Sequence, residues 1–408
     1  MISFETPKSI LKTVTMIESV ATEMMRPAAR YYDEHEHESP WEYINLMHAA
    51  LKAAGGLTMA PSPSTEDGTP RQDYQRLAHY IEALSWGDAG LYLCTPRGGL
   101  GAAAVSATGT PEQKSRFLDR FNGDKPIFSS MAITEPQAGS DTAAIKTTAV
   151  RDGDHWVLNG EKIFVTGGQK SLVDTPGFVV VWATIDPAAG REGIRSFVVE
   201  AGTPGCTVTK LEKKLGIRAS DTAAILLNNC RVPLDNMLGS IEAKAQSVEG
   251  YKGVLRTFAA TRPLVAASAL GIARAALEFL KEALAEHGVE IRNGLPRSRM
   301  TNLEREVIDM EIMLRSAWLL TLRAVWMADS RVPISAEASM SKIKAGDAVV
   351  RITQRAVELL GPIGYSRLHL LEKWFRDAKI NDLYEGTGQI NRLIVARRIL
   401  GYGRKELN

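Results

Sequence analysis

Cysteine is scarce in this sequence, and so is net charge. Three cysteines among 408 residues cannot build a disulfide framework, and none of them pair as C-x-x-C. This usage is typical of a reducing compartment, so we expect a cytoplasmic protein. The 49 Lys and Arg residues nearly balance the 47 Asp and Glu residues, which leaves a formal net charge of +2. Such a chain has no global field for nucleic acid or an anionic membrane, so local groups must meet any anionic ligand.

Long hydrophobic runs are also missing. No run of about 18 uncharged apolar residues is present, and residues 1–18 lack the apolar core of a secretory signal. We therefore expect no membrane insertion and no nucleic-acid partner. Hydrophobic residues make up 45% and charged residues 24%, which is ordinary for a globular protein and excludes wholesale disorder, collagen and long coiled coil.

Two zones of the chain have a helical period. Residues 1–125 repeat apolar positions at steps of three and four and predict a helical N-terminal domain, and Thr110 before Pro111 predicts a helix N-cap. Residues 243–408 return to long helices. The helices predicted in the two zones are Ser9–Arg26, Tyr43–Ala54, Tyr74–Trp86, Glu304–Met327, Ile334–Leu360 and Thr387–Leu400. The helix from Glu304 is apolar on nearly all faces, which indicates a bundle core or a subunit interface.

Between them, residues 126–242 change to short β-rich runs that alternate with turn pairs. Asp152-Gly153 and Asn159-Gly160 are strong hairpin signals. The strands predicted here are Thr147–Val150, His155–Leu158, Lys162–Val165, Phe178–Ile185, Ser196–Glu200, Thr207–Lys210 and Ala223–Leu227. Because no helices intervene, we predict a central antiparallel β domain and an α+β fold class.

Two local patterns imitate binding motifs. Gly99–Ala104 fits G-x-G-x-x-A, but Pro96 and Arg97 break any preceding strand, so close helix packing is favoured over a dinucleotide site. Residues 33–38 alternate acids with His35 and His37. Histidines two apart diverge on a helix and no other Cys/His cluster supports them, so a solvated charged helix end is favoured and no metal site is predicted.

Four further segments are harder to explain by packing. Residues 131–142 are polar and rich in small residues, which suits either a capped loop or a loop whose backbone N–H groups approach an anion. Residues 162–168 place Phe164 and Thr166 on one strand face, where an aromatic ring could stack on a planar cofactor and a hydroxyl could bond its edge.

The other two segments lie in the third zone. Thr261-Arg262-Pro263 opens it, with Pro263 suited to a helix first turn and Arg262 either a surface charge or a buried anchor. Residues 376–392 contain Tyr384-Glu385-Gly386-Thr387. Thr387 can cap the final helix, and Glu385 is either a charge near a helix N-terminus or a group facing a ligand.

In this order and separation, the segments resemble the acyl-CoA dehydrogenase family. The shared stretches are TEPxAGSD, N-G-x-K-x-[aromatic]-x-T, T-R-P and YEGTxQIxR. The resemblance implies a helical N-terminal domain, a central β domain and a C-terminal four-helix bundle. It also implies α,β-dehydrogenation of an acyl-CoA thioester, in which a carboxylate removes the α-proton and the β-hydride passes to N5 of FAD. The base implied is Glu385, since Thr261, where some members carry the base, cannot serve.

The resemblance also implies ligand contacts and partners. FAD contacts carry over to Met131, Ile133, Thr134, Ser140, Phe164, Thr166, Glu358, Gly361, Thr387 and Gln389. Substrate contacts carry over to Ser140, Arg262, Gly386 and Arg397. The implied substrate is an acyl-CoA or an acyl-carrier-protein thioester, the implied electron acceptor is an electron-transferring flavoprotein, and the implied assembly is a homo-oligomer, a dimer or tetramer.

Three departures from the family pattern stand out. Met131 replaces a frequent aromatic, and residues 358–362 (ELLGP) replace Q-x-F-G-G. Residues 287–300 replace R-x-x-F-G, which in the family crosses to the neighbouring subunit's FAD; Arg292 or Arg297 could substitute. Two alternatives therefore stay open. One is a structural, FAD-sharing subunit of a hetero-oligomer, and the other is an oxygen-using flavin monooxygenase or oxidase, which Glu385 disfavours.

Overall fold

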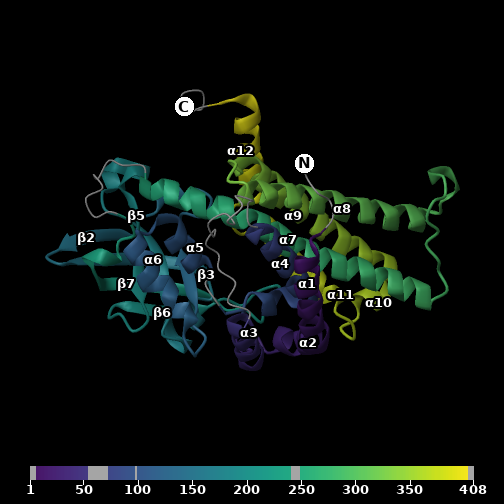
Figure 1. The fold of residues 1–408 in the computed structure, drawn as a ribbon, viewed down its shortest axis with the longest axis horizontal. Coiled ribbons are helices and arrows are strands. Elements are labelled where there is room, and N and C mark those ends of the chain that lie inside the picture. The colour runs from purple at the N-terminus through teal and green to yellow at the C-terminus, as the bar shows by residue number, and fades with distance from the viewer. Residues whose placement is uncertain (1–5, 54–71, 97–98, 240–248, 403–408) are drawn as a thin grey trace.

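The protein has the predicted α+β architecture, with helical zones on either side of a β domain in the chain (Figure 1). The computed structural model describes residues 6–53, 72–96, 99–239 and 249–402. In Figure 1 the sheet lies at one end, and the long helices α7 (Glu249–Glu286), α8 (Asn302–Asp329) and α9 (Ser335–Leu360) extend away from it. The predicted domain boundary between residues 125 and 126 stays a prediction, and the one between 242 and 243 lies outside the described residues.

The first zone is helical, as predicted. Its elements are α1 (Lys8–Val20), a π-helical turn (Ala21–Met25), α2 (Arg26–Glu34), α3 (Trp41–Ala53), α4 (Asp73–Tyr92), α5 (Gly99–Thr108) and α6 (Pro111–Leu118). Thr110 caps α6 in a reciprocal box with Gln113, which confirms that prediction. The close packing predicted for Gly99–Ala104 is also confirmed, because a Cβ on Gly101 would lie 2.7 Å from Ser129 Oγ.

The β domain is one sheet of seven strands, with the order β1-β4-β2-β3-β7-β6 and β5 paired to β4. The strands are β1 (Ser129–Ala132), β2 (Thr148–Asp152), β3 (His155–Thr166), β4 (Phe178–Thr184), β5 (Ile194–Glu200), β6 (Cys206–Leu211) and β7 (Thr222–Pro233). Most pairs are antiparallel as predicted, but β1 and β2 pair with β4 in parallel, so the sheet is mixed. Because the β2–β3 hairpin lies between β1 and β4 in the chain, β4 can pair with β1 while running in the same direction.

Asn159-Gly160 does not form the predicted hairpin turn. Both residues lie inside β3, a single 12-residue strand whose register against β7 shifts between Leu158 and Gly160. Asn and Gly favour bulges for the conformational reason that favours them in turns. Here the glycine allows a close approach, since a Cβ on Gly160 would lie 2.4 Å from Thr147 Oγ1.

This contact predicts the effect of Gly160→Ala. We expect the free energy of unfolding to fall by about 2–4 kcal/mol, because the added methyl group must push Thr147 aside and because Gly160, at φ +152°, has a backbone conformation that residues with a Cβ rarely adopt. Gly153→Ala is the matched control. Gly153 lies in the β2–β3 turn with φ +62°, and a Cβ added there would meet no atom within 4 Å. The control variant should therefore lose only about 1 kcal/mol, from backbone strain. Urea unfolding measures both, and an equal loss in the two variants would contradict the packing argument.

The third zone continues through three shorter helices, α10 (Pro362–Tyr365), α11 (Leu371–Ala378) and α12 (Gly388–Leu400). Pro263 lies inside α7 and not in a first turn, so Thr261-Arg262-Pro263 does not open the zone. The apolar stretch Thr257–Glu286 of α7 is long enough to cross a membrane by composition, yet 83% of its most apolar window is buried inside the molecule, as in a core helix. Ile312 and Leu319 of α8 are 58% and 48% exposed in the single chain, so this helix is not wholly inside the core of one chain, and its predicted place at a subunit interface stays a prediction.

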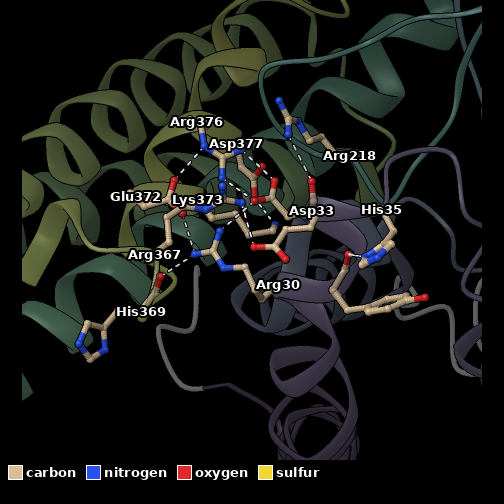
Figure 2. Close-up of polar contacts among 12 residues, drawn as sticks. Arg30, Asp33, His35, Arg218, Arg367, His369, Glu372, Lys373, Arg376 and Asp377 are labelled. Atoms are coloured by element: carbon tan, nitrogen blue, oxygen red, sulfur yellow. Dashed lines mark hydrogen bonds and ion pairs between the residues drawn. The ribbon is translucent and has the colours of Figure 1, made fainter.

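A buried cluster of charged residues joins the zones (Figure 2). Arg376 of α11 pairs with Asp33 of α2 at 2.6 Å, and Lys373 of α11 pairs with Asp377 at 2.6 Å and with Asp88 of α4 at 2.5 Å. The main-chain N–H of Ile217, from the loop between β6 and β7, donates to Asp377 Oδ1 at 2.5 Å. The expectation that the end of α2 is solvated is therefore wrong at Asp33, which is fully buried. The cluster holds α11 against α2, α4 and the loop between β6 and β7. In the chain, α11 comes directly before the segment that contains Glu385.

Candidate active site

Glu385 lies in a tight turn between a 3₁₀ segment (Lys379–Asp382) and α12. Its φ is +53° and that of Gly386 is +92°, so two successive residues are left-handed. Asn391 holds the turn, because its side-chain Nδ2 donates to the carbonyl oxygens of Gly386 at 2.8 Å and of Thr387 at 3.1 Å. The predicted cap is confirmed, since Thr387 Oγ1 accepts from the Ile390 N–H. A left-handed backbone conformation at a residue other than glycine costs about 1–3 kcal/mol. The hydrogen bonds from Asn391 and the Thr387 cap therefore stabilise a backbone conformation of Glu385 that would otherwise be unfavourable.

Two side chains of α7 contact this turn. The hydroxyl of Thr261 lies 2.5 Å from Glu385 Oε2, and Arg262 Nε donates to the Glu385 carbonyl oxygen at 3.4 Å. Thr261 and Arg262 are only 3% and 6% exposed. Arg262 is therefore a buried anchor and not a surface charge. The structure thus brings Arg262 next to Glu385 and Gly386, although more than a hundred positions of the chain lie between Arg262 and this pair.

At the turn, burial outweighs the nearby cations, so the net shift of the Glu385 pKa is upward. Burial raises the pKa of Glu385, while the Thr261 hydroxyl and the charges of Lys342 and Arg262 act to lower it. Lys342 of α9 is itself buried, which lowers its pKa to about 8. Burial also raises the pKa of the neighbouring Tyr384 phenol, and the Glu385 charge adds to that rise. A partly buried carboxylate in this setting can accept a proton from a weak carbon acid held against it.

The two predicted cofactor segments of the β domain are adjacent. The Ile163 N–H donates to the Thr134 carbonyl oxygen at 2.9 Å, and Lys162 pairs with Glu135 at 2.7 Å. Both charged groups are almost fully buried. Burial raises the pKa of Glu135, but Lys162 and the Lys146 N–H outweigh it, so the net shift is downward. This ion pair makes the loop after Thr134 and the strand before Phe164 one rigid unit.

The predicted cofactor residues of the β domain present different groups to solvent. The side chains of Met131 and Ile133 are buried in the cluster between the sheet and α5 and α6, so only their backbones can meet a ligand. The Phe164 side chain is 59% exposed at a second irregularity of β3, with φ +57°, and Thr166 beside it is half-buried. Ser140 is exposed in the neighbouring loop. An exposed aromatic ring beside a hydroxyl and a loop backbone suits the edge and face of a planar cofactor, so these residues fit a flavin.

Three predicted residues lie away from Glu385 in the single chain. Glu358 and Gly361 are at the far end of α9, about 24 Å and about 28 Å along the helix axis from Lys342. Arg397 is exposed in the last turn of α12, about 15 Å along that helix from Thr387. Gln389 is exposed in the first turn of α12. The Glu358 carboxylate accepts from Gln354 at 2.9 Å and pairs with Arg355.

The segment at residues 287–300 is fastened to its own chain. Arg292 forms a two-point contact with Glu304 of α8, at 2.6 and 3.0 Å, and Arg297 forms one with Asp309, at 2.7 Å on both oxygens. A cavity of about 660 Å³ lies beside the segment, lined by Val289, Ile291, Ile308, Ile312 and others. Both arginines that could replace the missing family arginine are therefore engaged within the chain.

Sequence reasoning missed the roles of Thr261, Lys342 and Asn391. For Lys342 a signal was present: it interrupts the apolar stripe of α9 formed by residues 338, 345, 349 and 352, all of which are buried. A lysine at a core position of an amphipathic helix needs a polar partner, which marks it for attention. For Asn391 the only signal in the sequence was its position four residues after Thr387, the N-cap of α12, which does not by itself predict its hydrogen bonds to the turn.

Comparison with known proteins agrees with this geometry. Family models match the three zones as the N-terminal (residues 10–123), middle (130–230) and C-terminal (249–400) domains of acyl-CoA dehydrogenase. Cyclohex-1-ene-1-carbonyl-CoA dehydrogenase of Geobacter metallireducens is 34% identical over 95% of this chain and 97% of its own. Human mitochondrial short-chain specific acyl-CoA dehydrogenase is 34% identical over 98% and 92%. Butyryl-CoA dehydrogenase of Megasphaera elsdenii, a solved structure, superposes with a TM-score of 0.81 at 26% identity, over 98% and 100%. The chain therefore belongs to the acyl-CoA dehydrogenase family of FAD-dependent oxidoreductases.

Proposed function

We propose that the protein oxidises an acyl thioester to the 2-enoyl thioester, with Glu385 as the base that removes the α-proton. The observation that carries this proposal is the Glu385 turn: its carboxylate is partly buried, hydrogen-bonded by Thr261 and held by Asn391 in a left-handed conformation. FAD, when bound, supplies the hydride acceptor at flavin N5. The thioester oxygen would accept from the main-chain N–H of Glu385, which increases the acidity of the α-proton.

Three groups of residues would hold FAD. Phe164 and Thr166 would meet the flavin ring, the backbone of Met131–Thr134 and Ser140 would follow its chain, and Thr387 and Gln389 would complete the site. Glu358 and Gly361 lie at the end of α9 opposite to Lys342 and the Glu385 turn. In this proposal they contact the FAD of a neighbouring copy, so the protein acts as a homo-oligomer, a dimer or tetramer.

The substrate side of the proposal follows the relatives. Their names describe short-chain and cyclohexene-carbonyl CoA thioesters, so we propose a short or cyclic acyl-CoA for this chain, with Arg262, Gly386, Ser140 and Arg397 on the substrate side. We further propose that an electron-transferring flavoprotein reoxidises the flavin, and that the protein works in the cytoplasm in fatty-acid metabolism.

Anaerobic mixing tests the proposal. Purified protein with stoichiometric FAD should lose its flavin absorbance when a substrate acyl-CoA is added, and mass spectrometry should find the product lighter by two hydrogens. A panel of linear, branched and cyclic acyl-CoAs, and acyl-carrier-protein thioesters, identifies the substrate. Rapid oxygen consumption during turnover would show an oxidase or monooxygenase instead. Failure to hold FAD without a second protein would show a structural subunit, an alternative that the engaged Arg292 and Arg297 keep open.

A further inference from the structure

Lys342 differs from the other buried lysines in the part of the chain that the structure describes. Lys162, Lys170 and Lys373 each pair with a carboxylate, at 2.7, 2.8 and 2.5 Å. Lys342 is equally buried, with 2% exposure, but within the described residues its ammonium has no carboxylate in ion-pair range and donates only to the Asn381 carbonyl oxygen, at 3.0 Å. A buried ammonium without an opposing charge is costly, so a negative group is expected near it.

Lys342 is held next to the Glu385 turn by two contacts of α9. Its ammonium donates to the Asn381 carbonyl oxygen, and Ser339, one turn earlier in α9, contacts Arg262, which also bonds the Glu385 carbonyl oxygen. The charges of Glu385 and Asp382 each raise the pKa of Lys342. Asp382 already pairs with Lys379 at 3.1 Å and is 22% exposed, so solvent and Lys379 meet most of its charge. Glu385 has no lysine or arginine paired to its carboxylate in the described chain; its Oε2 is met by the Thr261 hydroxyl alone. Within the described residues, a buried cation without an ion pair, on the Asn381 carbonyl, and a carboxylate without an ion pair, at Glu385, therefore stand four residues apart in the same segment of chain.

We propose that Lys342 is a positioning residue for the base, and that its buried ammonium keeps the Glu385 carboxylate ionised before the substrate arrives. The inference rests on the proposed function. Burial alone favours the neutral acid, which cannot take a proton from the substrate. An ammonium anchored on the Asn381 carbonyl, four residues before the base, opposes that effect without touching the carboxylate. The substrate can then reach Glu385 without displacing an ion pair.

The other groups around Glu385 do not replace Lys342 in this role. From α7, Thr261 supplies a neutral hydrogen bond. The charge of Arg262 also lowers the pKa of Glu385, in the same sense as Lys342, but the Arg262 guanidinium is already bound to the main chain of the turn and to Ser339 Oγ, at 3.4 Å each. From α4 and from the turn itself come the phenols of Tyr92 and Tyr384, whose pKa values are raised by burial and by the Glu385 charge, so both stay neutral. Asp382 is negative and acts in the opposite sense to Lys342.

The test is the pH dependence of kcat/KM in Lys342→Met. Removing the ammonium raises the pKa of Glu385, so the acid limb should move to higher pH by about one unit, and activity well below the limb should fall about tenfold. Activity on the alkaline plateau should change less than about threefold, because the base is ionised there in both proteins. Lys342→Arg keeps the charge and should keep the wild-type limb. Lys344→Met, which removes an exposed lysine of the same helix, is the matched control and should leave the limb in place.

An infrared titration reads the same carboxyl without turnover. The protonated-carboxyl band that disappears in Glu385→Gln reports the base directly, and its midpoint should rise in Lys342→Met. A pH-independent loss of activity with an unmoved midpoint would overturn the proposal and make Lys342 purely structural. If Lys342→Met does not fold, Lys342→Gln, which can keep a hydrogen-bond donor without the charge, decides in the same way. Full turnover by Glu385→Gln would refute the assigned base, whereas an unmoved midpoint refutes only the role of Lys342.

Discussion

Glu385→Gln is expected to slow the bleaching of the flavin by an acyl-CoA about 10²–10⁴-fold, the range that a positioned general base contributes. Glutamine has nearly the shape of glutamate and can still accept the Thr261 hydrogen bond that now reaches Oε2 at 2.5 Å. The turn and its bonds from Asn391 should therefore persist, and FAD content should be unchanged. Anaerobic stopped-flow spectroscopy at the flavin absorbance measures the rate.

Two further variants make this test specific. Glu161→Gln removes an exposed carboxylate from β3 and should bleach at the wild-type rate. Glu385→Gly combined with Thr261→Glu moves the carboxylate to the facing helix, where a longer side chain can reach the same space, and should recover part of the lost rate. Wild-type bleaching by Glu385→Gln, with FAD retained, would mean that another group takes the α-proton.

Local signals in the sequence predicted the fold well where the deciding contacts are close in the chain. The Thr110 cap bonds a residue three positions later, and the small side chains of Gly99–Ala104 indicated close packing directly. Asn159-Gly160 misled for a physical reason: the pair permits unusual backbone angles, and both a turn and a bulge use them. Only the partner strand β7, some seventy residues away, settles which one forms.

The candidate site was less accessible to sequence reasoning. The base was indicated by its resemblance to a family motif, and its cap by Thr387. The bond between Thr261 and Glu385 spans 124 positions, and the charge of Lys342 matters only because α9 packs behind the turn. Pro263 suggested a helix start because proline is common in the first turn of a helix. It lies inside α7, and the residue type alone does not distinguish the two positions. Such contacts depend on tertiary packing, which periodicity does not encode.

The largest effect on stability is expected for Lys373→Met. Lys373 joins two buried carboxylates, Asp88 at 2.5 Å and Asp377 at 2.6 Å. Figure 2 shows Lys373 together with Asp377. Replacing Lys373 with an apolar side chain of similar length leaves both carboxylates buried without their cation. Breaking a buried pair from one side costs about 3–5 kcal/mol, so the free energy of unfolding should fall by at least that amount. Urea unfolding of the variant and of Lys379→Met, which removes an exposed lysine beside the same helix, measures the difference.

The pH dependence of this loss identifies its cause. Burial raises the pKa of Asp88 above its ordinary value of 3.8 even while Lys373 opposes the shift, so losing the lysine must raise it further. A carboxyl whose pKa is higher in the folded state than in the unfolded state favours folding below the unfolded value, and that contribution is lost as the pH rises through the folded value. The deficit of Lys373→Met should therefore be largest at neutral pH and shrink as the pH falls toward 4. A deficit that stays constant over this range would point to lost packing, whereas one that shrinks shows that α4 and α11 are held together by charge.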